Sequence, residues 1–127
     1  MKYPRTFFKC DHCGNLVGMV DNAGVKIICC GEPMRLVEAN TVDAAVEKHI
    51  PAVTRNDNVL DVVVGEVAHP MTEDHHIAWV MAAQEHLTVR VALDVGADPK
   101  AQLLVGDGPV TVYAYCNLHG LWGVDVE

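Results

Sequence analysis

Apolar and polar residues alternate with a period of two in several short stretches of the chain, a pattern typical of β-strands with one buried face. In residues 87–91, for example, Thr88 and Arg90 separate three apolar residues, as in a half-solvated antiparallel strand. Similar Val-rich stretches predict strands at residues 52–55, 59–64, 77–83, 87–93, 102–105, 110–116 and 121–126. Turn-forming residues separate them at 56–58, 96–99 and 106–109. Seven short strands at this spacing predict a β-sandwich.

The first 37 residues have a different character. We expect short strands at 5–9, 16–20 and 25–28, with a turn at 21–24. A unit this short is rarely stabilised by a hydrophobic core alone, and its four cysteines could cross-link it instead. The pattern predicts an all-β chain of two domains, residues 1–37 and 38–127, joined through a linker at 38–47 with a helical turn around 42–48.

Charge and composition exclude several classes of partner. Nine basic and 17 acidic residues give a formal net charge of −8. The sequence has no basic stripe of the kind that a protein needs to bind nucleic acid or an anionic membrane surface. No run of about 18 apolar residues predicts a membrane span. The first ten residues also lack the apolar stretch of a signal peptide, so we expect a cytoplasmic protein. In a reducing compartment, five cysteines are better interpreted as metal ligands than as disulfides.

Four of those cysteines form a first candidate site. Cys10 and Cys13 are spaced C-x-x-C, which lets both sulfurs reach one metal, and Gly14 follows in a position suited to positive φ. Cys29 and Cys30 are adjacent, so their side chains must splay to share an ion. Four thiolates select zinc or iron, and spacing leaves the choice between these two metals open.

A second candidate site combines imidazoles with one thiol. Cys116 and His119 are spaced C-x-x-H, and the other candidate ligands, His49, His69 and His75, lie at predicted loops or loop-to-strand boundaries. Nitrogen-rich ligation with a single thiolate suits iron or copper. Five ligands would leave an octahedral metal one open position for chemistry. We interpret the remaining histidines as surface or core side chains that do not bind metal: His12, His76 and His86. For His76, strand alternation would turn its ring to the opposite face from that of His75.

Three motifs, in this order, resemble a known family. CDHCG at 10–14 with CCGEPM at 29–34 is similar to the desulforedoxin-type iron site. EKH at 47–49, HPMTEDHHI at 69–77 and YCNLHG at 115–120 are similar to the superoxide reductase site. Together they resemble desulfoferrodoxin, the two-iron superoxide reductase family, over nearly the whole chain.

The resemblance implies a desulforedoxin-like N-terminal domain, an immunoglobulin-like seven-stranded sandwich and two irons per chain. One iron would bind the four clustered cysteines; the other would bind four equatorial histidines and an axial Cys116. The activity implied is reduction of superoxide to hydrogen peroxide without dioxygen production, with electrons from a rubredoxin-like donor. The family also implies a cytoplasmic homodimer.

Two residues next to His49 are the candidates for catalytic roles. By the resemblance, Glu47 and Lys48 lie on a loop over the open position. Lys48 could attract the superoxide anion and position water, and Glu47 could offer a carboxylate to ferric iron after the product has left. Two other functions stay open from the residues alone: an electron-transfer or iron-storage protein of the rubredoxin or desulforedoxin type, and a copper-binding module.

Overall fold

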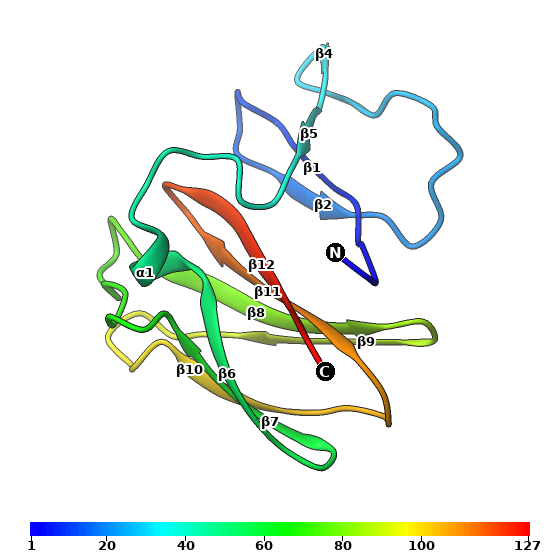
Figure 1. Cartoon of the computed structure of the whole chain (residues 1–127). Coiled ribbons are helices and arrows are strands. Elements are labelled where there is room, and N and C mark those ends of the chain that lie inside the picture. Colours follow the sequence, from blue (N-terminus) through cyan, green and yellow to red (C-terminus); the bar gives the residue numbers. More distant parts are fainter. The chain divides into compact units, whose positions relative to one another are not determined.

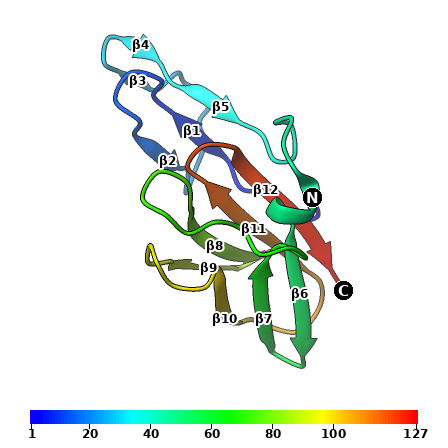
Figure 2. The same cartoon turned by 90° about the vertical axis from the view of Figure 1, so that its left-hand side faces the viewer.

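The computed structural model describes all residues, 1–127. The chain divides into a small unit, Arg5–Glu38, and a sandwich unit, Ala39–Glu127, with which Met1–Pro4 are grouped. The first residues belong with the sandwich because the amide of Lys2 donates to the Asp125 carboxylate and the amide of Tyr3 donates to the Thr111 hydroxyl, 2.9 Å away. Each unit is described by itself below (Figures 1 and 2).

The sandwich unit is built from seven antiparallel strands in two sheets (Figure 2). The three-stranded sheet has the order β10-β7-β6, with bounds Lys100–Leu104, Val59–Val64 and Pro51–Asn56. The four-stranded sheet has the order β12-β11-β8-β9, with bounds Gly120–Val126, Val110–Cys116, Ile77–Gln84 and Leu87–Ala92. The prediction of an all-β chain with a seven-stranded sandwich is confirmed, and its immunoglobulin-like assignment stays a prediction.

Alternate residues of both sheets form one core between them. β7 contributes Leu60, Val62 and Val64 to it, and each is at most 1% exposed. Side chains of β8, β10 and β11 complete the core, and the strand β11 is buried along its whole length. Full burial of one Val or Leu side chain is worth about 1.5–3 kcal/mol, so this core is a large source of stability that does not depend on a metal.

The small unit has two minimal sheets. β1 (Phe7–Lys9) lies between β2 (Leu16–Gly18) and β5 (Arg35–Val37), and β3 (Ile28–Cys29) pairs with β4 (Glu32–Pro33). The prediction of a strand at 25–28 was wrong apart from its last residue, and β4 and β5 were not predicted. The short β3–β4 hairpin exists because Cys30 and Gly31 turn the chain at positive φ, 53° and 77°. The predictions at 5–9 and 16–20 do contain β1 and β2, whereas β4 has only two residues, one of them a proline, and gives no strand pattern.

The sandwich unit contains one helical turn, which precedes its first strand. α1 spans Val46–His49, so it overlaps the turn predicted around 42–48 but starts four residues later and ends one residue beyond it, where Ile50 leads into β6. The structure contains no helix with the length and apolar character needed to cross a membrane.

Candidate metal centres

The five residues of the second candidate site meet at one end of the sandwich. His49 ends α1 just before β6, while His69 and His75 lie in the connection from β7 to β8. Cys116 ends β11 and His119 lies in the turn to β12. Antiparallel pairing brings the start of one strand beside the end of its neighbour. Residues up to 70 positions apart therefore come together although none of the five is adjacent to another in sequence.

The donor atoms of these side chains converge on one point. One ligand atom from each of the five lies within 4.8 Å of all the others. His49 Nε2 is 3.1 Å from both His69 Nε2 and His119 Nδ1, and Cys116 Sγ is 3.4 Å from His69 Nε2. Metal bonds of about 2.0–2.3 Å put two ligands of one ion no more than about 4.6 Å apart. The spacing fits a single metal ion bound by four imidazoles and one thiolate.

The hydrogen bonds of the rings show that the inward nitrogens carry lone pairs. His49 Nδ1 donates to the carbonyl of Ala45 at 2.6 Å, and His69 Nδ1 donates to the carbonyl of Pro70 at 2.7 Å. In the neutral rings the proton is therefore on Nδ1, and the two Nε2 atoms face each other as acceptors without a proton between them. His75 Nε2 is buried and has no hydrogen-bond partner. A metal cation satisfies all three atoms at once, and backbone carbonyls behind ligating rings are typical of metal sites.

Burial keeps the imidazoles neutral. Burial, followed by the nearby charges of His49 and His75, lowers the pKa of His69 to about 4. Burial is also the main cause that lowers the pKa of His49 and of His75. The Cys116 thiol is fully buried, and this burial raises its pKa in the protein without metal. Metal binding must therefore displace the thiol proton, whereas burial already favours the neutral, metal-binding form of His49, His69 and His75.

Two neighbours that the sequence did not reveal shape this cluster. The Trp122 ring stacks on His49 with centroids 4.9 Å apart, and its Nε1 donates to the carbonyl of His119 at 3.0 Å. Gly65 lies against the backbone of α1, where a Cβ would approach the carbonyl oxygen of Glu47 to 2.6 Å and that of Ile50 to 2.8 Å. The sequence gives only a weak signal for the role of Gly65, because an isolated glycine can occur for many different structural reasons.

The structure places Glu47 and Lys48 on α1, directly before His49, with both side chains exposed. The amide of Val67 donates to the carbonyl of Glu47 at 3.0 Å, which fixes the turn that carries these residues. After burial and the neighbouring imidazoles, the positive charge of Lys48 is a further cause that lowers the pKa of His75. The Lys48 ammonium therefore acts electrostatically on the cluster.

The four cysteines of the small unit form a second cluster with sulfurs within 4.8 Å of one another. Gly14, at φ 82°, closes the first loop by donating its amide to the carbonyl of Cys10 at 2.9 Å. Cys13 Sγ and Cys29 Sγ are 3.6 Å apart, and the Asn15 side chain donates to Cys29 Sγ. Only Cys10 among the four is buried, so this site lies at the surface of its unit.

A backbone amide and the neighbouring thiols shift the pKa values of Cys10 and Cys30 in opposite directions. The backbone amide of Cys13 is the main cause that lowers the pKa of Cys10 to about 6. The Cys13 thiol, followed by that of Cys10, raises the pKa of Cys30 to about 12. Four thiolates at this spacing need a cation between them, and a soft metal such as iron supplies it. All five cysteines of the chain are free thiols.

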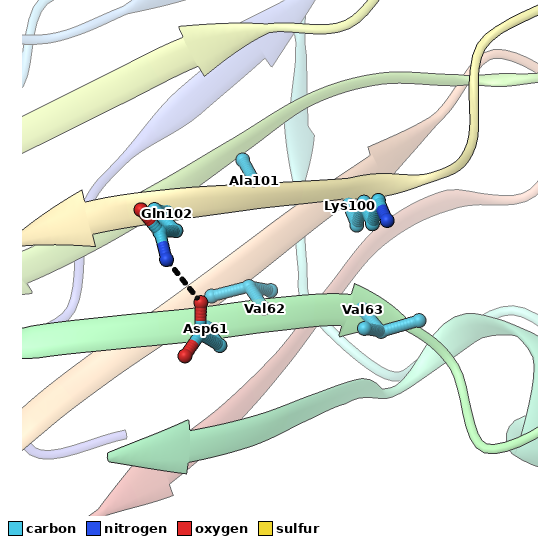
Figure 3. A pocket seen from close by; sticks show the side chains of 6 residues that line it. All are labelled: Asp61, Val62, Val63, Lys100, Ala101 and Gln102. Carbon is cyan, nitrogen blue, oxygen red and sulfur yellow. Dashed lines mark hydrogen bonds between the residues drawn. The ribbon is translucent and has the colours of Figure 1, made fainter. Parts of the chain in front are cut away.

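The remaining histidines lie outside both clusters. His12 forms an exposed pair with Glu32 at 3.0 Å, His86 is exposed next to Glu85, and His76 Nδ1 contacts the carbonyl of Thr72. A surface hollow of about 340 Å³ on β7 and β10 also contains none of the candidate ligands (Figure 3). Within its lining, the Gln102 amide donates a 2.8 Å hydrogen bond to the Asp61 carboxylate.

Comparisons with known proteins agree with this geometry. The family model for desulfoferrodoxin matches residues 41–125, and that for the desulfoferrodoxin N-terminal domain matches residues 5–37. A desulfoferrodoxin homolog of Archaeoglobus fulgidus is 44% identical over 115 residues, which are 91% of this chain and 92% of that protein. A desulfoferrodoxin of Nitratidesulfovibrio vulgaris is 41% identical over 91% of both chains.

Solved structures are similar as well. The superoxide reductase from Treponema pallidum superposes with a TM-score of 0.77 at 39% identity, covering 95% of this chain and 98% of that one. The one-iron superoxide reductase from Giardia intestinalis has a TM-score of 0.55 at 31% identity, covering 64% of this chain and 98% of its own. The second protein thus corresponds to only part of this chain.

Proposed function

Because this chain belongs to the desulfoferrodoxin family, we propose that it is a superoxide reductase, an oxidoreductase that reduces superoxide to hydrogen peroxide without producing dioxygen. The observation that carries the proposal is the convergence of four imidazole nitrogens and one thiol within 4.8 Å at one end of the sandwich. The two donor sets fit two irons per chain, one held by Cys10, Cys13, Cys29 and Cys30, the other by His49, His69, His75, His119 and Cys116.

Ferrous iron, when bound, supplies the single electron that superoxide requires, and the residues of this chain control its access and its surroundings. Four neutral imidazoles leave the positive charge of the metal largely uncompensated, which attracts an anion into an acidic protein. The Cys116 thiolate adds one negative charge and strong electron donation. The amide of His119 donates to Cys116 Sγ at 3.4 Å and so moderates that donation.

Lys48 and Glu47 have separate roles in this proposal. Lys48 attracts superoxide and positions the water from which a proton is delivered, since its charge acts on the cluster and its side chain reaches solvent. Glu47, on the same exposed turn, offers its carboxylate to ferric iron after the product has left. Residues 38–127 form the catalytic domain, and residues 1–37 form the iron domain of the four cysteines. A purely electron-transfer protein would use only the iron domain of the four cysteines, and the buried imidazoles of the sandwich would then have no role.

Three further parts of the proposal rest on the family and on surface properties. We expect a homodimer, because the small unit exposes apolar side chains, including Val20 at 98% and Val25 at 76% exposure. A rubredoxin-like protein would return electrons to the iron. The cytoplasm is the expected compartment, since five free thiols suit a reducing environment. Sedimentation and electron-transfer assays with purified rubredoxin test the first two.

The function is tested by pulse radiolysis of the reduced, iron-loaded protein. We expect rapid consumption of superoxide with one peroxide formed per iron oxidised and no dioxygen released. Cys116→Ser removes the thiolate and should abolish the ferric thiolate absorption band and nearly all activity. Dioxygen release, or normal turnover by Cys116→Ser, would contradict the proposal.

A further inference from the structure

The two segments that carry His75 and Cys116 are joined by one side chain. Asn117 directly follows Cys116 and is half-buried. Its Oδ1 accepts a hydrogen bond from the amide of His76 at 2.8 Å, and its Nδ2 donates to the carbonyl of Asp74 at 3.0 Å. These are the peptide groups immediately before and after His75. The Asn117 side chain therefore holds His75 from both sides.

The backbone at the same position strengthens this link. The amide of Asn117 donates to the carbonyl of His76 at 3.2 Å. The β8–β11 ladder has a register shift between Tyr115 and Cys116, so regular strand pairing is disturbed directly before the candidate ligand Cys116. Bulges leave the chain locally irregular, and a side chain that bonds to backbone groups can fix its course there.

Other hydrogen bonds at His75 are local and do not fix it relative to Cys116. The amide of His75 donates to Thr72 Oγ1 at 3.2 Å, and the amide of Thr72 donates to the carbonyl of His75 at 2.9 Å. These bonds stabilise the turn at residues 72–75 but do not connect it to the segment that carries Cys116. His49 and His69 have ring nitrogens bonded to backbone carbonyls, whereas His75 Nε2 points into the cluster without a partner.

We propose that Asn117 is a positioning residue of the sandwich metal centre, which sets the position of the His75 imidazole relative to the Cys116 sulfur. Asn117 itself does not bind the metal. Its two side-chain hydrogen bonds make the insertion of His75 into the coordination sphere less costly in conformational entropy. Partners outside the ligand set typically change metal affinity by about 10–100-fold when removed. The inference rests on the iron site of the proposed function.

The test measures ferrous iron affinity of the full chain under anaerobic conditions, in competition with a chelator. Tryptophan fluorescence is the readout, because both tryptophans belong to the sandwich unit and Trp122 stacks on His49. Asn117→Ala should weaken iron binding by about 10–100-fold and speed its release. The matched control is Asn58→Ala, which also removes two side-chain hydrogen bonds, to Val105 and Asp107, but at the β6–β7 turn. This control should bind iron within about twofold of the unmodified protein.

A double-mutant cycle separates positioning from general destabilisation. In a His75→Ala background, Asn117→Ala should weaken iron binding by less than about twofold, because the imidazole it positions is absent. An equal loss in both backgrounds, or an unchanged affinity of the single variant, would overturn the inference. If Asn117→Ala does not fold, Asn117→Ser, which can keep at most one of the two hydrogen bonds, is measured against the same outcomes. Failure of the unmodified protein to bind iron at the sandwich site would instead contradict the proposed function.

Discussion

The small unit and the sandwich unit both gather ligand side chains around a point, but they differ in how much buried structure surrounds the cluster. In the small unit, four apolar or cysteine residues are buried: Phe7, Cys10, Met34 and Val37. Two of its four candidate ligands, Cys13 and Cys30, are exposed. In the sandwich, twelve fully or nearly fully buried residues form a continuous core that includes the ligand Cys116, and His49 and His69 are buried as well.

This difference indicates opposite relations between metal and fold. A unit of 34 residues with strands of two or three residues cannot repay its loss of conformational entropy by burial alone, so metal binding and folding are coupled there. The sandwich has enough buried apolar surface to fold first and to hold its imidazoles in place before metal arrives. The metal organises the small unit, whereas the sandwich organises its metal site.

The largest effect is expected from removing one exposed thiolate. Cys13→Ser should abolish iron binding in the small unit and unfold residues 5–38, while the sandwich keeps its fold and most of the superoxide reduction. Amide NMR spectra check this, since only signals of the small unit should lose dispersion. The control is Cys116→Ser, which should leave both units folded. Collapse of the sandwich signals in Cys13→Ser would show that the two units do not fold independently.

The second prediction concerns acid. The unfolded chain protonates His69 at its ordinary pKa of 6.5, whereas in the fold this pKa is about 4, so the unfolded state binds more protons between these values. The metal-free sandwich should therefore lose stability as pH falls from 6.5 to 4, by about 3 kcal/mol from His69 alone at 1.36 kcal/mol per pKa unit. Urea unfolding followed by tryptophan fluorescence measures it.

Replacement of an exposed imidazole supplies the control for this experiment. His86→Ala removes a side chain that is 91% exposed and should leave the pH dependence unchanged. Because His49 and His75 are shifted in the same direction, the total loss should exceed that from His69 alone. A stability that stays constant or rises on acidification would contradict the claim that the fold holds neutral imidazoles in place.

A smaller effect is expected from the charge beside the sandwich site. Lys48→Ala should slow the second-order reaction with superoxide by about tenfold and weaken its dependence on salt, because local positive charge must overcome the net charge of −8. The Debye length of about 8 Å at physiological salt limits this attraction to nearby charges. Pulse radiolysis at two salt concentrations is the measurement. Lys2→Ala, the same charge change next to Asp125 at the far end of β12, should leave the rate unchanged.

The smallest kinetic effect is expected for the other residue of the α1 turn. Glu47→Ala should keep the encounter rate within about twofold, because in the proposed function its carboxylate acts only after the product has left. The absorption spectrum of the ferric protein should nevertheless change, since water or hydroxide would replace the carboxylate. A rate loss like that of Lys48→Ala would assign both residues to substrate attraction.

The sequence by itself was sufficient for the regular parts of the molecule. Period-two alternation and short Val-rich apolar runs located all seven sandwich strands to within a few residues, although β11 is buried on both faces and does not alternate. The C-x-x-C and C-x-x-H spacings indicated both clusters, since neighbouring ligands reach one metal through a local turn. The strand β4 was missed because it consists of two residues, one of them Pro33, and β5 was missed because its three residues lie outside any longer alternating stretch, unlike β1 and β2.

Only the tertiary structure decided how distant ligands meet and what supports them. The pairing of His49 with His119 depends on antiparallel strands that return to one end of the sandwich, which no local pattern encodes. The carbonyls that hold the ring protons of His49 and His69 are close in sequence, but only the fold brings the two Nε2 atoms to 3.1 Å from each other. The roles of Trp122, Gly65 and Asn117 arise from contacts across long sequence separations, such as the 41 residues between Asn117 and His76. The sequence determines which side chains can bind a metal, but the packing of the folded chain determines the distances between their ligand atoms.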